Sequence, residues 1–326
     1  MLKNRDAPLR LKLPLKSLTL PPPAFTFALV HHPVDISIII VTFNSSGCVN
    51  ACLESITRQV GASHEILVVD NASKDDTRDK VRNWPCRLIA SAENLGFGRG
   101  CNLGFSQSQG RYAFFLNPDA YLDGPNTLAQ MIKRMDANPS IGLAGTSVLA
   151  PDGQPESPPA LDYPGQRHLR HPLPPLPGQI AWVIGASMIV RRSLFAELRG
   201  FDPSFFLYCE ETELCLRIRK AGFQIGFFPE IIVKHIGGAS ETPGDPYQTA
   251  FRKMQGLLRF REKHYVPADR KRLAKRDFYR ARWRAAWNGF LIRKGKSSDS
   301  AWQKARSYSA IRDVSLSYLK EGLPPS

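Results

Sequence analysis

The sequence lacks the patterns that mark several classes of protein. It contains no run of about 18 apolar residues, the length that a membrane-spanning helix needs, so we expect no transmembrane segment. The apolar residues of the basic N-terminal stretch are interrupted at Pro14 and at residues 21–23, which is unlike a secretory signal. The six cysteines include no CxxC pair and no cysteine–histidine cluster with zinc spacing. Because no disulfide framework is indicated, we place the protein in a reducing cytoplasm.

Acidic residues are scarce, and the shortage is local. The 326-residue chain carries 44 Lys and Arg against 29 Asp and Glu, which gives a formal charge of +15. Residues 252–306 alone hold 18 Lys and Arg against 4 Asp and Glu. A basic region of this kind is typical of proteins that bind nucleic acid, anionic lipid or an anionic substrate.

We divide the chain into three parts. Residues 1–34 alternate basic and apolar residues and end in prolines, which predicts a flexible extension or, alternatively, an amphipathic surface anchor. Residues 35–245 contain the apolar runs of a folded α/β domain. Residues 246–326 predict a basic helical region that begins with an amphipathic helix over 246–265. Within the α/β domain, residues 150–178 are rich in proline and lack periodicity, which indicates a loop or lid.

Strand, polar strand end and helix alternate four times between residues 36 and 120. This alternation is typical of a doubly wound α/β fold with a mostly parallel sheet flanked by helices. Right-handed crossovers bring the carboxyl ends of such strands to one edge, where these sheets bind their ligands. The polar residues expected to line that crevice are Thr42, Asn44, Asp70, Asn71, Asn94 and Asp119.

The stretch Tyr112–Ala120 is the most informative of these segments. Its apolar start predicts a strand buried on both faces, and Pro118 should end that strand because proline cannot donate to a sheet. Asp119 then lies at the carboxyl end of a buried strand, where a carboxylate could hold a divalent metal against a phosphate. The alternative is that Asn117, Pro118 and Asp119 only form a turn.

The second half of the domain predicts four more strands. Gly185 falls inside the second of them, a position that often marks close approach of a ligand. His235 follows the last strand directly, and two interpretations stay open, a hydrogen-bonded structural histidine or a metal ligand. The strands are expected over residues 141–149, 182–190, 224–228 and 231–233.

Three acids, Glu210, Glu211 and Glu213, open a helix that is expected to end near Gly222. Acids in a first helical turn complement the helix dipole, and Glu213 can pair with Arg217 one turn later. The other interpretation is a general base at the helix N-terminus, where backbone N–H groups keep a carboxylate ionised.

The segment 94–104 is rich in glycine and is expected to be a loop that passes into a helix ending near Gly110. It lacks the dinucleotide fingerprint G-x-G-x-x-G, because Cys101 and Leu103 stand where the last glycine would be needed. Binding of a diphosphate by the backbone of this loop stays open.

Several of these segments together resemble one enzyme family. They are SIIIVTFN, EILVVDNASKDDT, ENLGFGRGCNLG, FFLNPDA, VIGASMIVRR and GFDPSFFLYCEETELCLRIRKAGF. In this order they are similar to the family 2 inverting glycosyltransferases with the GT-A fold, and among these to the rhamnosyltransferase-like group that builds bacterial surface polysaccharides. The resemblance covers about residues 35–265 and implies a donor half over 35–120 and an acceptor half over 121–245.

The resemblance implies a binding site for a nucleotide-sugar donor. Asn117 and Asp119 take the place of the family's DxD motif and are expected to contact the donor sugar and diphosphate. Asp119 and His235 are the implied ligands of a divalent metal, Mg²⁺ or Mn²⁺. The implied nucleotide-binding residues are Thr42, Asn44, Asp70 and Asn71, with Ser73 nearby, and Asn94, Gly96 and Asn102 in a loop that closes on the nucleotide.

The resemblance also assigns the catalytic base to Glu211, with Glu210 as the alternative. Relatives usually carry aspartate at the position of Glu211, and a misplacement of about 1 Å can cost about a hundredfold in rate. The acceptor is expected to contact Trp182, Gly185, Ala186 and Glu213, together with the segment 150–178.

The expected function is the metal-dependent transfer of a sugar from a nucleotide-diphosphate donor to a glycan or lipid-linked acceptor. The sugars considered include rhamnose, and the expected pathway is cell-envelope polysaccharide synthesis. The basic C-terminal region would then contact the inner face of the cytoplasmic membrane. One alternative is a GT-A-fold protein that binds sugar nucleotides without turnover. The other, less favoured, is a nucleic-acid-binding protein whose bases stack on Phe278, Tyr279, Trp283 and Trp287.

Overall fold

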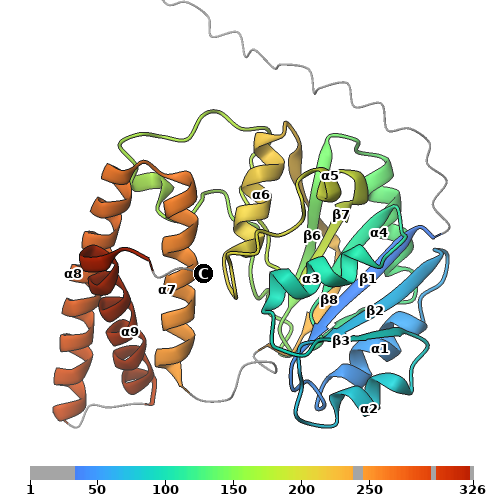
Figure 1. The fold of residues 1–326 in the computed structure, drawn as a ribbon, viewed down its shortest axis with the longest axis horizontal. Coiled ribbons are helices and arrows are strands. Elements are labelled where there is room, and N and C mark those ends of the chain that lie inside the picture. The colour runs from blue at the N-terminus through green and yellow to red at the C-terminus, as the bar shows by residue number, and fades with distance from the viewer. Residues whose placement is uncertain (1–33, 238–244, 295–298, 324–326) are drawn as a thin grey trace, which may run out of the picture.

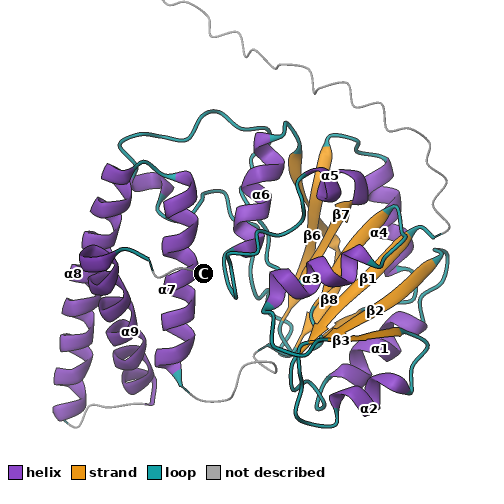
Figure 2. Cartoon of the chain, viewed as in Figure 1, coloured by secondary structure: helices purple, strands orange, loops and turns teal. Residues whose placement is uncertain are grey.

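The computed structural model describes residues 34–237, 245–294 and 299–323 (Figure 1). An eight-stranded sheet with helices on both faces forms one side of the molecule, and three long helices form the other (Figures 1 and 2). Most of the predicted N-terminal extension, and the glycines that follow His235 from residue 238, lie outside the described residues.

The sheet combines a parallel half with an antiparallel insertion. Its order is β3-β2-β1-β4-β7-β6-β8-β5. The first four strands in this order pair in parallel, whereas β7 is antiparallel to both of its neighbours and β5 is antiparallel to β8. The expected α/β class with a flanked, largely parallel sheet is therefore confirmed. The strands are β1 Ile36–Thr42, β2 His64–Asp70, β3 Arg87–Ala90, β4 Tyr112–Leu116, β5 Ala120–Leu122, β6 Ile141–Leu149, β7 Ser187–Arg191 and β8 Gln224–His235.

Helices cover both faces of the sheet because its strands are apolar on both sides. In β1, Ile36, Ile38 and Ile40 join the core on one face, while Ile39 and Val41 join the core on the other. The helices are α1 Val49–Thr57, α2 Thr77–Arg82, α3 Phe97–Ser106, α4 Thr127–Asp136, α5 Arg192–Glu197, α6 Glu210–Lys220, α7 Pro246–His264, α8 Pro267–Arg293 and α9 Asp299–Glu321, with a 3₁₀ turn, η1, at Gln166–His168.

Two strand predictions need correction. The strand expected over 182–190 begins only at Ser187, because Trp182 bridges to Ala160 and the chain turns at residues 185–186. The two short strands expected over 224–233 are one strand, β8, whose pairing with β6 shifts register between Phe228 and Ile232. Pro229 lies in that shift, and proline cannot donate a ladder hydrogen bond, so it produces a bulge rather than a strand end.

The glycine-rich segment is a helix rather than a loop over most of its length. Only residues 94–96 precede α3, and the later glycines let the helix pack closely on the sheet. A Cβ atom at Gly104 would lie 2.6 Å from Ile39 Cγ2, and one at Gly100 would lie 2.9 Å from Val41 Cγ1. These two glycines therefore serve helix–sheet packing.

The C-terminal helices are fastened to the α/β part through α7. Asp245 caps α7 by accepting a hydrogen bond from the Tyr247 backbone at 3.0 Å. Phe260 on α7 is fully buried and stacks on Tyr163, and Leu273 on α8 joins the same apolar cluster. Among the described helices, none is long and apolar enough to cross a membrane.

Candidate functional site

The carboxyl ends of β1 and β2 meet through hydrogen-bonded side chains. Thr42 Oγ1 donates to Asp70 Oδ1 at 3.0 Å, and the other oxygen of Asp70 accepts from Arg78 Nε at 2.5 Å. The chain then turns sharply after each strand, because Asn44 and Ala72 adopt the left-handed backbone with φ of 50° and 61°. Non-glycine residues in this conformation carry strain, and they concentrate at functional sites.

The expected nucleotide-binding residues beyond these strand ends also lie together. Asn44 Oδ1 accepts a hydrogen bond from the Lys74 backbone at 2.8 Å. Asn71 Nδ2 donates to Gly96 O at 3.0 Å, and Asn94 Oδ1 accepts from Gly96 N at 2.9 Å. Asn71 Oδ1 is buried without a hydrogen-bond partner in the described structure, so an acceptor atom is left for a ligand.

The loop before α3 touches the segment that leads to the acidic helix. Gly96 has φ of 79°, and a Cβ atom there would lie 2.0 Å from Phe206 O. The next residue, Phe97, donates its backbone N–H to the same carbonyl at 3.1 Å. Glycine is therefore required where the donor half meets the chain that precedes α6.

Both polar atoms of the Asn102 side chain bond the backbone of one residue, Phe201. Its Oδ1 accepts from Phe201 N and its Nδ2 donates to Phe201 O, both at 2.8 Å. Both polar atoms of the amide thus hold the chain after α5 against α3. This geometry gives Asn102 a positioning role.

Asp119 and His235 face each other at the same edge of the sheet. β5 pairs with β8 so that Ala120 lies opposite His235, which brings His235 Nε2 to 3.1 Å from Asp119 Oδ1. The amide of Asn117 lies 3.2 Å from the same ring nitrogen, and Glu156 Oε2 lies 2.5 Å from Nδ1. The two carboxylates therefore hold the imidazole from both sides.

These neighbours determine the charge of the histidine. Burial alone lowers the pKa of His235, but the hydrogen bond and charge of Asp119 and then those of Glu156 outweigh it and raise the pKa to about 9. The ring is 7% exposed and the Asp119 side chain 3% exposed, so solvent screens these charges weakly.

The donor atoms here suit a hard divalent cation. Among the described residues, no group of three or more His, Cys, Asp or Glu side chains could hold a metal by itself. Asp119 supplies an oxygen, and His235 supplies a nitrogen once a bound cation displaces its Nε2 proton, while Glu156 occupies the far ring nitrogen as an orienting carboxylate commonly does in metal sites. Mg²⁺ and Mn²⁺ often take one or two protein ligands and fill the rest of their shell from phosphates, so the pair fits such an ion.

The two acids that begin α6 differ in surroundings. Glu210 is 3% exposed and its Oε2 has no hydrogen-bond partner in the described structure, whereas Glu211 is partly exposed. Burial raises the pKa of Glu210 well above its ordinary value, and the charge of Glu211 raises it further. Burial also raises the pKa of Glu211, against hydrogen bonds from the backbone and Thr212 that lower it. Two neighbouring like carboxyls disfavour each other's ionisation, and the buried Glu210 is the one whose charged form is disfavoured most.

Strained backbone positions these acids. Tyr208 and Cys209 have φ of 72° and 69°, and Cys209 O accepts the first helical hydrogen bond, from Glu213 N at 2.9 Å. Two consecutive non-glycine residues in the left-handed region hold a sharp turn into α6. The turn is supported from α7, where a Cβ atom at Gly256 would lie 2.3 Å from Tyr208 O.

The expected acceptor residues divide into two groups. Gly185 lies beside Glu211, since a Cβ atom there would be 3.8 Å from Glu211 Cβ, and Ala186 O accepts from Asn117 N at 3.1 Å. These two residues link the acid to the end of β4. Trp182 Nε1 donates to Asp162 O at 3.3 Å and thereby fixes part of the segment 150–178.

Glu213 forms a buried ion pair. Its carboxylate accepts two hydrogen bonds from Arg217 Nε, at 2.8 and 2.9 Å, and lies 3.3 Å from His264 Nε2. The side chain is 2% exposed. The geometry therefore matches the pairing with Arg217 one turn later, and it connects α6 to α7.

The sequence patterns do not identify Glu156 or Arg78 as site residues. Glu156 comes from the proline-rich segment, where no periodicity distinguishes one side chain from the next. Arg78 belongs to α2 and reaches Asp70 across the strand ends.

Fold and site together define a class. A parallel half-sheet that ends in Asn and Asp side chains, faced by a helix that opens with acids, is the architecture of GT-A glycosyltransferases. The chain belongs to the glycosyl transferase family 2, whose model matches residues 37–199. A second model, glycosyl transferase family group 2, matches residues 166–311. The chain is therefore a glycosyltransferase.

Relatives of known name agree. An N-acetylglucosaminyl-diphospho-decaprenol L-rhamnosyltransferase of Mycobacterium tuberculosis is 27% identical over 64% of this chain and 78% of its own length. A low-salt glycan biosynthesis hexosyltransferase of Haloferax volcanii is 28% identical over 59% of this chain and 64% of its own. The chain is thus similar to rhamnosyltransferases and to other hexosyltransferases.

Solved structures share the fold. The Pyrobaculum calidifontis mannosyltransferase PcManGT, in complex with GDP-Man and Mn²⁺, has a TM-score of 0.56 at 16% identity and covers 90% of this chain and 88% of its own. Staphylococcus aureus TarS in complex with UDP has a TM-score of 0.53 at 16% identity and covers 88% of this chain and 92% of its own. At such identities these structures establish the fold alone.

Proposed function

We propose that the protein transfers a sugar from a nucleotide-diphosphate donor to a glycan or lipid-linked acceptor in one inverting displacement. The observation that carries this proposal is a chain of contacts along one edge of the sheet. Glu211 lies beside Gly185, and the next residue, Ala186, accepts the hydrogen bond from Asn117. Asn117 and Asp119 both contact His235. The proposed base, Glu211, and the proposed diphosphate-binding residues, Asp119 and His235, thus lie along the same edge of the sheet.

The donor nucleotide would lie over the ends of β1 and β2. Thr42 and Asp70 fix each other there, and the unpaired Asn71 Oδ1 offers an acceptor for a base or ribose donor group. Asn94 and Gly96 shape the loop that would close on it. Because the ion pair with Arg78 fixes the Asp70 carboxylate, Asp70 would present this group to the nucleotide in one orientation.

The diphosphate would lie against Asp119 and His235, which would hold the divalent metal. When bound, such an ion neutralises charge on a departing diphosphate, so no protein acid is required to protonate it. Asn117 can hydrogen-bond the transferred sugar without adding charge. Glu156 keeps the His235 ring in the orientation that points Nε2 toward Asp119.

The acceptor hydroxyl would be deprotonated by Glu211 as its oxygen attacks the anomeric carbon. A single attack on the face opposite the leaving group inverts that centre. Burial raises the pKa of Glu210 well above its ordinary value, so Glu210 would hold the proton of the pair and Glu211 would act as the base. Gly185 presents no side chain beside Glu211, which leaves room for a hydroxyl to approach.

The names of the relatives suggest which donor and acceptor to expect. One relative is named for transfer of L-rhamnose to a decaprenol-linked diphosphate sugar, which favours a rhamnose donor and a lipid-linked acceptor here. A lipid-linked acceptor places the enzyme at the membrane surface, and we expect peripheral association through the basic C-terminal region on the cytoplasmic side.

A transfer assay tests the proposal. Purified protein is incubated with each nucleotide sugar, an undecaprenyl- or decaprenyl-diphosphate sugar acceptor and Mn²⁺, and the product is analysed by NMR. We expect one donor to give a product of inverted anomeric configuration. A retained configuration would contradict the mechanism, and donor binding without any product would favour the inactive alternative.

A further inference from the structure

The outer face of α8 carries a row of exposed aromatic side chains. Tyr279, Trp283, Trp287 and Phe290, called here the aromatic ridge, are spaced by four, four and three residues and so share one helical face. Their side chains are 62%, 64%, 51% and 50% exposed. Large aromatic residues in such a contiguous patch mark a surface that binds something.

The aromatic ridge is not part of the protein core. The opposite face of α8, with Leu273, Ala274 and Ala281, is the one that is buried. The ridge side chains pack on one another instead. The ring centroids of Trp283 and Trp287 lie 6.2 Å apart with 10° between the ring planes, and the centroid of Phe290 lies 6.0 Å from that of Trp287. Stacked rings leave no gap in which a nucleic-acid base could insert between them.

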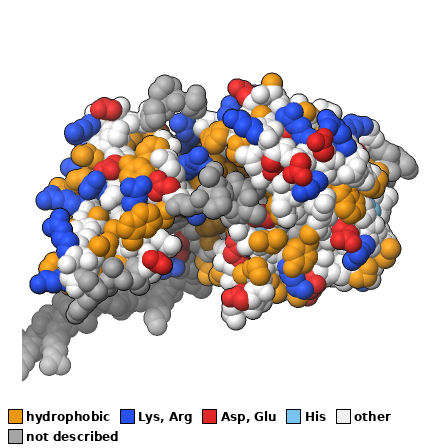
Figure 3. All heavy atoms as spheres, turned by 90° about the horizontal axis from the view of Figure 1, so that it is seen from below, with side chains coloured by type: hydrophobic (Ala, Val, Ile, Leu, Met, Phe, Trp, Pro, Cys, Tyr) orange, Lys and Arg blue, Asp and Glu red, His pale blue; other side chains and the backbone are white. Residues whose placement is uncertain are grey.

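Basic side chains lie on both sides of the aromatic ridge. Asp269 and Asp277, the acids of α8, are turned toward the protein: Asp269 binds the backbone of residues 170–171, and Asp277 pairs with Arg261. The outer face of α8 as described therefore carries positive charge without carboxylates, and Figure 3 shows Lys and Arg side chains along this edge with apolar ones between them. The exposed basic residues beside the ridge, on α8 and at the residue that follows it, are Lys275, Arg276, Arg280, Arg282, Arg293 and Lys294.

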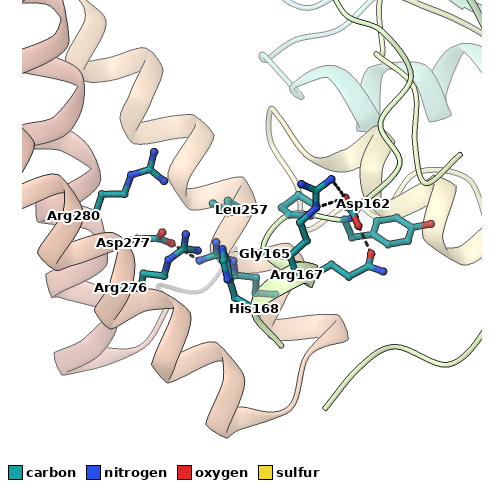
Figure 4. A pocket seen from close by; sticks show the side chains of 12 residues that line it. Asp162, Gly165, Arg167, His168, Leu257, Arg276, Asp277 and Arg280 are labelled. Atoms are coloured by element: carbon teal, nitrogen blue, oxygen red, sulfur yellow. Dashed lines mark hydrogen bonds and ion pairs between the residues drawn. The ribbon is translucent and has the colours of Figure 1, made fainter. Parts of the chain in front are cut away.

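A basic cavity opens beside the ridge. It has a volume of about 430 Å³ and lies between the segment 162–168 and helices α7 and α8 (Figure 4). Arg276 and Arg280 line it from α8, together with the nearly buried Arg261, whose Nε has no hydrogen-bond partner in the described structure. Asp162 and Asp277 also line the cavity and pair with Arg167 and Arg261, so Arg276 and Arg280 are the arginines on the α8 side that stay available for a phosphate group.

We propose that the outer face of α8 docks on an anionic phospholipid bilayer, with the aromatic ridge at the level of the headgroups and the flanking Lys and Arg on lipid phosphates. Tyr and Trp concentrate at membrane–water interfaces, and basic amphipathic helices lie in that plane. A second copy of this chain fits less well, since self-association would bring two positively charged faces together. The inference rests on the proposed function in one respect: docking would bring the enzyme to a lipid-linked acceptor.

Co-sedimentation of the full chain with vesicles tests the inference without turnover. We compare vesicles of phosphatidylcholine alone with vesicles that also contain about 30% phosphatidylglycerol, which gives them the negative surface charge of an anionic leaflet. We expect binding to the anionic vesicles that falls on the order of tenfold for Trp283→Ser/Trp287→Ser and for Arg282→Gln/Arg293→Gln. Val60→Ser, an equally exposed apolar position at 56% but remote from α8, is the control and should bind as the parent does.

Other results would overturn the inference. Equal binding of the parent and the ridge variants to anionic vesicles would place the membrane contact elsewhere. Binding to a DNA or RNA oligonucleotide but not to vesicles would assign the face to nucleic acid, and a dimer that dissociates in the ridge variant would assign it to self-association. An unchanged thermal shift with nucleotide ligands in both variants shows that the donor site is intact, so failure of docking and failure of the proposed transfer are distinguished.

Discussion

Individual side chains in this site depend on carboxylates that serve different purposes. Glu210 and Glu211 are adjacent in sequence, but burial raises the pKa of the first well above its ordinary value, whereas hydrogen bonds oppose the effect of burial on the second, which we propose as the base. Asp119 and Glu156 both contact His235, from opposite ring nitrogens. The residue type alone therefore does not define the role, and exposure and neighbours do.

Substitution of the two acids separates their roles. We expect Glu211→Gln to lower kcat by roughly 100- to 10,000-fold, the usual contribution of a general base. Glu210→Gln should keep most of the activity, because the amide mimics a protonated carboxyl of the same shape. Steady-state kinetics of both variants measure this, and a larger loss in Glu210→Gln would transfer the base to Glu210.

Glu156→Gln tests the support of the histidine. The amide keeps the size of the side chain but removes the charge that faces His235 Nδ1. Loss of such an orienting carboxylate typically weakens metal affinity by about 10- to 100-fold. Titration of donor binding with Mn²⁺ measures the effect. The exposed Asp152→Asn, in the same segment, is the control, and equal Mn²⁺ affinity in both variants would remove Glu156 from the site.

Among the elements, α3 and the segment before α6 decide how the two halves of the domain meet. Gly96 has a positive φ and contacts Phe206 O, and Asn102 one turn into the helix holds Phe201. Both contacts join the donor side to the chain that carries the acids. Gly96 and Asn102 therefore make two separate contacts between α3 and the chain that precedes α6.

Gly96→Ala should disturb this junction. Its Cβ would lie 2.0 Å from Phe206 O, and alanine is disfavoured at a φ of 79°, so we expect a loss of stability of about 1 kcal/mol or more and a raised KM for the donor. Gly47→Ala is the matched control, since nothing lies within 4 Å of its added Cβ. Urea unfolding of both variants measures the difference, and equal midpoints would contradict the assigned contact.

Some elements could be predicted from the sequence and others could not, for physical reasons. The buried strands β1, β2 and β4 are largely continuous apolar runs, so their existence and the polar residues at their carboxyl ends could be predicted. β5 has three residues and exists only through its pairing with β8, so no local pattern reveals it. The bulge at Pro229 and the turn before Ser187 likewise arise from partners distant in the chain.

The candidate site was predictable to a similar extent. Asp119 and His235 are separated by more than a hundred residues, yet Asp119 follows β4 and His235 is the last residue of β8, so their meeting could be inferred from strand-end positions and a family resemblance. Glu156 could not, because its position depends on how an irregular segment folds back on β8. Nor could the pairing of Asn102 with Phe201, since both lie in segments whose contacts only the assembled domain determines.

In the whole molecule, the helical layer is joined to the α/β part by buried charge as well as by apolar packing. Asp269, at the start of α8, is 1% exposed and accepts backbone hydrogen bonds from Arg170 and His171 and side-chain bonds from Arg272. Burial alone would raise its pKa, but these bonds dominate and hold the pKa of Asp269 well below its usual range. The ionised carboxylate therefore fastens α8 to the proline-rich segment 150–178.

The sign of the pH dependence follows from this lowered pKa. A carboxyl whose pKa falls on folding stabilises the protein above its unfolded pKa, near 3.9, and that stabilisation is lost as the pH falls toward the folded value. We expect Asp269→Asn to lower the thermal midpoint at pH 7 and to differ less from the parent near pH 3. The exposed Asp79→Asn is the control, and an equal difference at both pH values would contradict the account.

The most direct measurement of the central claim is a thermal-shift panel of nucleoside diphosphates and nucleotide sugars, with and without Mn²⁺, on the parent and on Asp119→Ala. A ligand at a hundred times its Kd stabilises a folded protein by about 2.7 kcal/mol, which shifts the midpoint measurably. The account predicts a shift with one nucleotide family that depends on Mn²⁺ and disappears in Asp119→Ala. No shift with any nucleotide, or an equal shift in the variant, would contradict it.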